Sequence, residues 1–293
     1  MLNKKAELTT QQIVVIIVLI VSFAILLFFL FRLDLGKTTD DELCYNSVVM
    51  RGKSILGGAA PPLKCNRQYI CFTEDGSCET MTEPDLIEVD EAGEVYKALA
   101  DEMANCWWMF GSGEIDYVGS DILSNWYCSI CSQIGFDDSM IEIFPSGKVN
   151  EDYFYNEYLA QEKSGKDDLT YSEYFFGTKD FSEINKKDFE GFSLDKQYFV
   201  MTGIMSKSTW EQVVIGAVTV GAFVAIPVTM GTSTFVLGAL YVGGAAAVGG
   251  TGGYFVGAII DGKLGNTYLF PTMIEVNSEK FDSLGCKSIT TLA

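Results

Sequence analysis

Two cysteines, Cys128 and Cys131, have a spacing that could carry redox or metal chemistry. On a helix, a C-x-x-C pair can exchange thiols for disulfides, because the start of the helix lowers the pKa of the first thiol. The same sulfurs could also supply half of a tetrahedral metal site, with Cys106 or Cys78 as further ligands. We predict a short helix around the pair. No thioredoxin-like strand–helix–strand pattern surrounds it, so a structural role is favoured over either chemistry.

Other familiar catalytic groups are absent or lack their context. The chain has no histidine, which removes the usual general base, the usual zinc ligand and every Ser/His or Cys/His dyad. Gly52-Lys53-Ser54 lacks the upstream glycine of a phosphate-binding loop. Asp137-Asp138 and Asp167-Asp168 lack the residue order of a calcium loop, so a solvated surface is the favoured interpretation. We predict no catalytic residue, no metal site and no cofactor.

The cysteine pattern predicts an exported domain braced by disulfides. All eight cysteines lie outside the two long apolar stretches of the chain, in segments that can share one side of a membrane. Disulfides persist on the oxidising, exported side of a membrane, whereas cytosolic thiols are kept reduced. Many pairings are open to eight cysteines, and the sequence does not choose among them. The residues concerned are Cys44, Cys65, Cys71, Cys78, Cys106, Cys128, Cys131 and Cys286.

The first apolar stretch predicts a membrane anchor. From Ile13 to Phe31 the chain has no charge, and Ser22 is its only polar residue. A helix of this length roughly spans the hydrocarbon core of a bilayer. Lys4 and Lys5 precede it and an acidic region follows, which places the amino terminus in the cytoplasm under the positive-inside rule. We expect a cytoplasmic segment at 1–12 and an anchor helix at 13–32.

The segment from Lys4 to Ile13 (KKAELTTQQI) resembles the archaeal pilin-type, class III signal, in which a basic and a small residue precede a short polar stretch and a helix. The resemblance covers about 30 residues and implies cleavage after Ala6. Gln11 stands where such pilins usually carry Glu, which speaks against filament assembly. An uncleaved signal anchor is the simpler alternative.

The second apolar stretch predicts a helical hairpin. Residues 212–261 hold two runs long enough to cross a bilayer, separated by a turn near 227–234 that contains Pro227. In the second run Ala245, Gly249, Gly253 and Gly257 recur every four residues, so a helix would present them as a ridge for close packing. The alternative is an apolar hairpin buried in a water-soluble domain, as in some pore-forming proteins before insertion.

The acidity of the chain belongs to the part between these stretches. Residues 33–211 carry 34 acids and 14 bases, a net charge of −20, while the whole chain carries −19. Such a surface repels phosphate backbones and anionic lipid heads, so we expect no nucleic acid partner. We predict that 33–211, joined by 262–293, forms an acidic extracellular α+β domain.

Several elements of this domain are predicted from local patterns. Apolar residues from Glu91 to Phe110 recur at helical spacing, and Gly111 follows them. We predict strands at 44–50, 64–73, 197–205 and 267–276, with a turn at Asp75-Gly76. The last two strands flank the apolar hairpin and should pair antiparallel, with Pro271 on an edge strand.

The whole arrangement resembles exported, cysteine-rich, membrane-anchored proteins of small-genome archaea. The resemblance is carried by the anchor helix, the segments KCNRQYIC and DEMANCWWMFGSGE, the C-x-x-C, and the glycine-rich hairpin before a terminal LGC. It implies an architecture and a compartment, and it implies no activity.

Three functional hypotheses follow from the sequence. The first is a non-enzymatic protein of the cell membrane, with its main domain and carboxyl terminus outside, for adhesion, envelope structure or secretion-system assembly. Its partners would be the bilayer and either a second copy or an envelope protein. The second is an oligomeric pore or membrane-remodelling protein that assembles through the glycine ridge. The third is a membrane thiol oxidoreductase that uses Cys128 and Cys131.

Overall fold

The structure is a computed structural model that describes most of the region between the apolar stretches and parts of the remainder. The described residues are 14–23, 25, 35–54, 61–118, 127–165, 168–176, 191–206, 225–230, 233–238, 259–261, 266–278, 281–282 and 286–288. The chain divides into two compact units, Met1–Glu42 and Leu43–Ala293. The sheet and the disulfides belong to the second unit.

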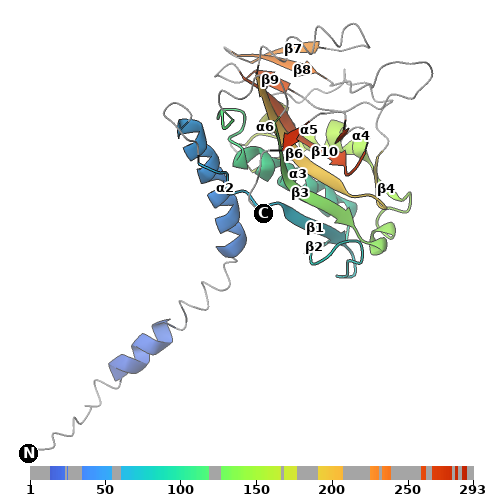
Figure 1. Cartoon of the computed structure of the whole chain (residues 1–293). Helices are drawn as coiled ribbons and strands as arrows, with labels where there is room; N and C mark the ends of the chain where they lie inside the picture. The colour runs from blue at the N-terminus through green and yellow to red at the C-terminus, as the bar shows by residue number, and fades with distance from the viewer. Residues whose placement is uncertain are drawn as a thin grey trace, which may run out of the picture. The chain divides into compact units, whose positions relative to one another are not determined.

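A mixed nine-stranded sheet forms the framework of the second unit (Figure 1). Its order is β2-β1-β3-β6-β10-β9-β8-β7, and β11 also pairs with β3. The β1–β2, β1–β3 and β11–β3 pairs are parallel, and the other pairs are antiparallel. The strands are β1 (Gln68–Thr73), β2 (Asp85–Glu88), β3 (Tyr127–Phe136), β6 (Tyr198–Ser206), β7 (Ala225–Met230), β8 (Ser233–Gly238), β9 (Ile259–Asp261), β10 (Asn266–Glu275) and β11 (Lys287–Ser288).

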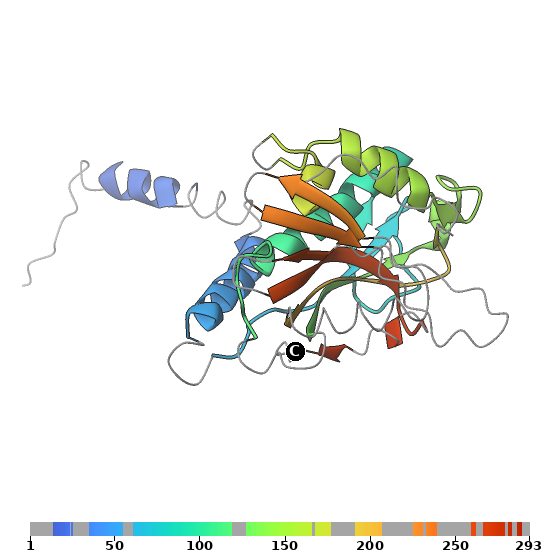
Figure 2. The same ribbon diagram turned by 90° about the horizontal axis from the view of Figure 1, so that it is seen from above.

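Helices cover one face of the centre of this sheet (Figure 2). Helix α3 lies against β6 and β10, and α6 contacts both α3 and β10. The short strands β4 (Lys148–Val149) and β5 (Phe192–Ser193) form a separate antiparallel pair. The helices are α2 (Leu35–Ser54), α3 (Ala92–Met109), the 3₁₀ turn η2 (Asp138–Ile141), α4 (Glu151–Tyr153), the π-helical turn η3 (Phe154–Tyr158), α5 (Leu159–Gln161) and α6 (Tyr171–Phe176).

Helix α3 is the central helix, and its sequence explains both its buried face and its end. Val95, Leu99 and Met103 recur at spacings of four and are fully buried against the sheet. At the carboxyl end, Gly111 adopts a φ of +80°, and its N–H donates to the carbonyl of Trp108 at 2.9 Å. Glycine is common at the position just past the end of a helix, where the backbone often adopts a left-handed conformation. The helix predicted from 91 to 110 is confirmed.

The strands predicted around the second apolar stretch are also confirmed. Strands β6 and β10 pair antiparallel from Asn266↔Ser206 to Glu275↔Tyr198. The expected edge position of Pro271 is wrong, because β10 lies between β6 and β9. Proline is tolerated there because the β6–β10 register shifts between Leu269 and Thr272, and β9 pairs only with 267–269.

Two local predictions are wrong: one predicted strand is a helix, and one predicted helix is a strand. Residues 44–50, predicted as a strand, lie in helix α2. Cys44, Ser47 and Val48 are buried there at spacings of three and four, and this helical period outweighs the β-branched Val48-Val49 pair. Cys128-Ser-Ile-Cys131, predicted as a helix, lies in strand β3. Between its neighbours β1 and β6, this segment is part of an extended ladder.

The predicted helical hairpin at 212–261 is wrong for the residues that the structure describes there. Strands β7 and β8 form an antiparallel pair from Ala225↔Gly238 to Met230↔Ser233, and 259–261 forms β9. Pro227-Val228-Thr229 suits an extended chain better than a helix, because proline disrupts a helix interior and β-branched side chains favour strands. The rest of the hairpin, including the ridge Ala245, Gly249, Gly253 and Gly257, lies outside the described residues.

The described part of the first apolar stretch is helical at 14–23 and at 25. Over the part of the chain that the structure describes, no helix has both the length and the apolar character needed to cross a membrane. Residues 1–12, with the cleavage predicted after Ala6, lie outside the described residues. The coarse prediction of an α+β domain braced by disulfides is confirmed.

Candidate functional site

Strand β3 carries the C-x-x-C pair, and strand geometry separates its two sulfurs. Side chains alternate between the faces of a strand, so residues three positions apart point to opposite sides. Cys131 bonds to Cys106 of α3, with Cα atoms 5.6 Å apart. Cys128 bonds to Cys286, which precedes β11, with Cα atoms 5.5 Å apart. The pair therefore braces β3 on both faces of the sheet.

A break in the β3–β6 ladder helps to seat Cys131 beneath the helix. The register shifts between Ile130 and Ser132, so Cys131 occupies the irregular position of the strand. Cys131, Ser132 and Ile134 are all buried. Cys131 is the extra residue at this shift, so the burial of Ser132 and Ile134 continues after it while the strand keeps its pairing with β6.

The remaining disulfides brace the start of the same sheet. Cys44 of α2 bonds to Cys65, three residues before β1. Cys71 of β1 bonds to Cys78 in the loop that follows it. Every cysteine of the chain is therefore bonded, and none is free. The predicted set of disulfide cysteines is confirmed, and its connectivity is Cys44–Cys65, Cys71–Cys78, Cys106–Cys131 and Cys128–Cys286.

This connectivity removes the geometric basis of the redox and metal hypotheses for Cys128 and Cys131. Thiol exchange by a C-x-x-C motif needs two sulfurs that can bond to each other, and these two bond to distant partners. Metal coordination needs thiolates, and both sulfurs are held as disulfides. Within the described ranges, no cluster of three or more Cys, Asp or Glu side chains could hold a metal ion.

A polar cluster that the sequence analysis did not assemble lies where the parallel strands β1 and β3 end. Thr73 ends β1, and Asp137 follows β3 directly. The Asp75 Oδ1 atom accepts hydrogen bonds from the Thr73 hydroxyl at 3.1 Å, the Ser77 amide at 2.9 Å and the Ser77 hydroxyl at 2.7 Å. Ser139 joins the two loops, because its hydroxyl accepts a hydrogen bond from the Glu74 amide at 3.1 Å.

Asp137 caps η2 from within this cluster. Its carboxylate accepts hydrogen bonds from the Ser139 amide at 3.0 Å and the Glu79 amide at 3.3 Å. The residue is only 5 % exposed, so the solvated surface predicted for Asp137 is wrong, because its carboxylate is enclosed by the backbone amides that it accepts hydrogen bonds from, whereas Asp138 is exposed. Burial acts to raise the pKa of Asp137, but the hydrogen bonds from Ser139 and Glu79 outweigh it and hold the pKa below its ordinary value. The carboxylate is therefore ionised at neutral pH and stabilises the two loops.

A second polar contact links α3 to α6. The Tyr171 hydroxyl donates to Asp101 Oδ1 at 2.5 Å, and Lys97 Nζ donates to Asp101 Oδ2 at 2.6 Å. Burial raises the pKa of Tyr171, and the hydrogen bond to Asp101 raises it further. Burial, followed by the charges of Glu162 and Asp101, raises the pKa of Tyr158 to about 12. These phenols stay protonated at neutral pH and serve as hydrogen-bond donors and packing groups.

The sequence carried a partial signal for this second contact. Lys97 and Asp101 are four residues apart on a predicted helix, which is the spacing of a surface ion pair. Tyrosine and phenylalanine are dense between 153 and 198, and rings of Tyr96, Tyr158 and Tyr171 pack in succession. Which tyrosine reaches Asp101 depends on how α6 packs against α3, and no local pattern encodes that.

No protein family, curated protein or solved structure matches the chain. What its own geometry offers is a domain whose cysteines are all bonded and in which the two polar clusters described above are joined by internal hydrogen bonds. Such an arrangement can hold the described loops in place.

Proposed function

We propose that this chain is a membrane-anchored protein of the cell surface or envelope, with a structural, adhesive or secretion-assembly role and no enzymatic activity. The observation that carries the proposal is the complete pairing of the eight cysteines. Three of the four bonds join sulfurs more than twenty residues apart. Such bonds form and persist in an oxidising, exported compartment.

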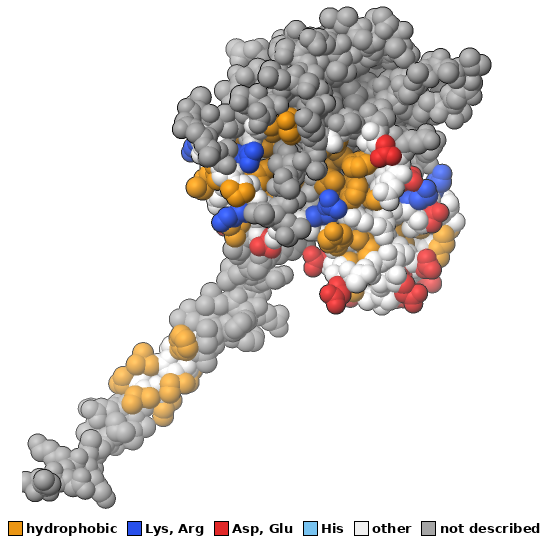
Figure 3. Space-filling view, viewed as in Figure 1, with side chains coloured by type: hydrophobic (Ala, Val, Ile, Leu, Met, Phe, Trp, Pro, Cys, Tyr) orange, Lys and Arg blue, Asp and Glu red, His pale blue; other side chains and the backbone are white. Residues whose placement is uncertain are grey.

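The amino-terminal helix supports the membrane part of the proposal. From Val14 to Ile25, every apolar side chain that the structure describes is at least 45 % exposed (Figure 3). The Ser22 hydroxyl donates to the carbonyl of Val18 at 2.8 Å. Lipid offers no partner for a polar group, so an internally bonded serine suits a helix surrounded by lipid. The apolar sequence continues to Phe31, long enough to span a bilayer.

The distribution of charge supports the orientation. Lys4 and Lys5 precede the apolar stretch, and the net charge of 33–211 is strongly negative. Positive residues are retained on the cytoplasmic side of membranes. The amino terminus would then lie in the cytoplasm and the disulfide-braced domain outside, where its acidity keeps it away from anionic lipid heads.

Amine labelling of intact cells tests this orientation. The side chains of Lys97 and Lys163 are 66 % and 65 % exposed. A membrane-impermeant amine reagent should modify both on intact cells and should reach Lys4 and Lys5 only after lysis. Labelling of Lys4 on intact cells, with Lys97 protected, would overturn the orientation.

Two further measurements test the compartment and the anchoring. Mass spectrometry of the non-reduced protein taken directly from cells should give the four pairs found in the structure. Free thiols at Cys106 or Cys131 in freshly trapped protein would contradict an oxidising compartment.

The protein should also stay in the membrane pellet after alkaline carbonate washing. Release of the intact chain into the supernatant would contradict anchoring.

A further inference from the structure

Strand β2 forms one edge of the sheet, and no described strand pairs with its outer side. Strand β2 ends the strand order, and it pairs with β1 alone among the described strands. An open edge presents backbone N–H and C=O groups on which another chain can add a strand. Strand β2 is therefore the place where this domain could extend its sheet with a partner.

The β1–β2 register places apolar side chains beside this edge. Leu86 lies opposite Cys71, and Tyr69 lies two residues before Cys71, so Leu86 and Tyr69 share one face of the sheet. Both side chains are 45 % exposed. Cys71 on this face is fully buried, as are Ile70 and Phe72 on the opposite face, so the exposed apolar area near the edge belongs to Leu86 and Tyr69. The open edge thus offers an added strand both backbone groups and an apolar contact on one side.

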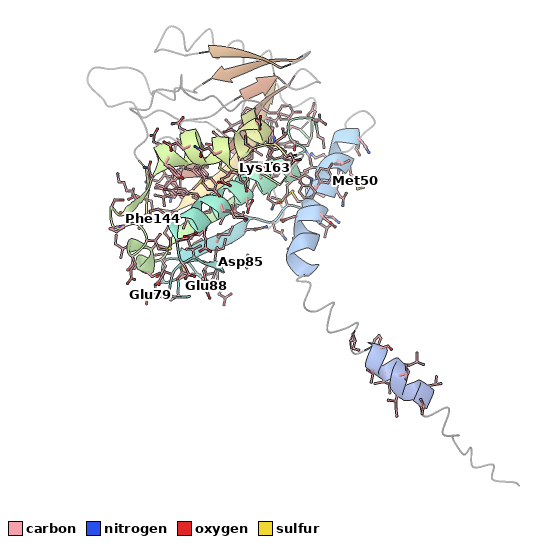
Figure 4. The ribbon with its side chains drawn as sticks, turned by 180° about the vertical axis from the view of Figure 1, so that it is seen from behind. Met50, Glu79, Asp85, Glu88, Phe144 and Lys163 are labelled. Atoms are coloured by element: carbon pink, nitrogen blue, oxygen red, sulfur yellow. A yellow bond between two sulfur atoms is a disulfide. The ribbon has the colours of Figure 1, made fainter. Side chains whose placement is uncertain are left out.

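The chain segment that contains β2, between Arg67 and Lys97, carries charge of a single sign. From residue 68 to residue 96 the chain has nine acids and no lysine or arginine. All nine are exposed, and none forms an ion pair with another described residue. They are Glu74, Asp75, Glu79, Glu83, Asp85, Glu88, Asp90, Glu91 and Glu94. Glu79, Asp85 and Glu88 gather at one corner of the domain (Figure 4), and acidic side chains follow the lower rim in Figure 3.

We propose that β2 is a docking edge for an extended, lysine- or arginine-rich segment of a partner protein, which adds to the sheet as a new strand. The backbone of β2 would supply the hydrogen bonds, Leu86 and Tyr69 the apolar contact, and the acids the preference for a basic segment. This inference does not depend on membrane anchoring.

The same charges argue against a second copy as the occupant. Two β2 edges brought together would oppose Asp85 and Glu88 with identical acids, and like charges on paired strands are destabilising. Acidic edges of this kind also keep sheets from associating with themselves. A basic strand is the occupant that turns this repulsion into attraction.

Peptide binding to the full-length protein in detergent tests the proposal. The probe is a fluorescent nine-residue peptide in which lysine alternates with valine, followed by fluorescence anisotropy. We expect saturable binding that weakens at least tenfold when the salt concentration rises from 50 mM to 500 mM, because salt screens exposed charges. No binding at peptide concentrations up to about 1 mM, equivalent to about 4 kcal/mol, would overturn the proposal.

Two matched controls separate strand addition from simple charge attraction. The double variant Asp85→Lys with Glu88→Lys should bind the peptide at least tenfold more weakly. The control variant Glu157→Lys with Glu162→Lys makes the same charge change at exposed acids elsewhere, and its affinity for the peptide should change less than threefold. A peptide with N-methyl groups on alternate residues keeps every charge but loses backbone donors, and it should bind at least tenfold more weakly to the unaltered protein. Equal losses in both variants, or equal binding of the methylated peptide, would overturn strand addition, and the peptide comparison needs no variant to fold.

Discussion

Breaking the Cys128–Cys286 disulfide should destabilise the domain far more than breaking Cys71–Cys78. The first bond joins residues 158 positions apart and the second joins residues 7 positions apart. In the chain-entropy description, closing loops of these lengths restricts the unfolded chain by about 5 and about 2 kcal/mol. The expected difference in the free energy of unfolding is therefore about 3 kcal/mol.

The two bonds make a matched comparison because their strand cysteines are equally enclosed. Cys71 is 0 % exposed and Cys128 is 4 % exposed. Replacing both partners of either bond by alanine therefore leaves a similar packing defect in the sheet. The variants are Cys128→Ala with Cys286→Ala, and Cys71→Ala with Cys78→Ala.

Urea unfolding of the full-length chain in detergent, followed by tryptophan fluorescence, to which the buried Trp107 contributes, measures the difference. At a denaturant dependence of about 3 kcal/mol per molar urea, the two midpoints should lie about 1 M apart. Mass spectrometry would first confirm that the other three bonds remain. Equal midpoints would refute the argument, since loop length would then not govern the contribution of these bonds.

Three further predictions concern single side chains. Asp137→Ala should cost about 1 kcal/mol at neutral pH through loss of a helix cap. Because the pKa of Asp137 is lowered from 3.8, this cost should be present above that pH and should disappear as the pH falls through the folded-state pKa, and a cost that does not vary with pH would contradict the assignment. Gly111→Ala should lower the midpoint of thermal unfolding more than Gly147→Ala does. Both glycines have positive φ, but an added Cβ at Gly111 would lie 2.6 Å from Ile115, whereas one at Gly147 would have no neighbour within 4 Å. Tyr171→Phe should cost about 2 kcal/mol in urea unfolding through loss of the hydrogen bond to an ionised carboxylate, and an unchanged midpoint would exclude that contribution.

The parts of the fold that the sequence predicts are those with a long, regular apolar period. Helix α3 has buried residues at Val95, Leu99 and Met103 and a glycine stop, so one local pattern suffices. Strands β6 and β10 are long and rich in β-branched and aromatic residues, and each borders the second apolar stretch. Their position in the chain predicts the antiparallel pairing that the register shows.

The wrong predictions concern short segments whose structure depends on distant partners. Residues 44–50 contain valines that favour a strand, yet helix α2 buries Cys44 and Val48 on one side. The segment 128–131 is too short to show a period, and its neighbours β1 and β6 determine that it is extended. The connectivity of the disulfides depends on the same tertiary contacts, so the cysteines predicted a disulfide framework without predicting which residues are partners.

The two ends of the second apolar stretch are held together by the sheet. Ser206, the last residue of β6, pairs directly with Asn266, the first residue of β10. Bringing the ends of a long segment together costs conformational entropy. The hydrogen bonds and side-chain contacts of the β6–β10 ladder offset that cost for residues 207–265. The Cys128–Cys286 bond adds a covalent tie, because Cys128 lies on β3, the neighbour of β6, and Cys286 follows β10 in the chain. Reduction of the Cys128–Cys286 bond alone should therefore loosen the attachment of the segment around Cys286 to β3. It should leave helix α3 in place, because the separate Cys106–Cys131 bond ties that helix to β3.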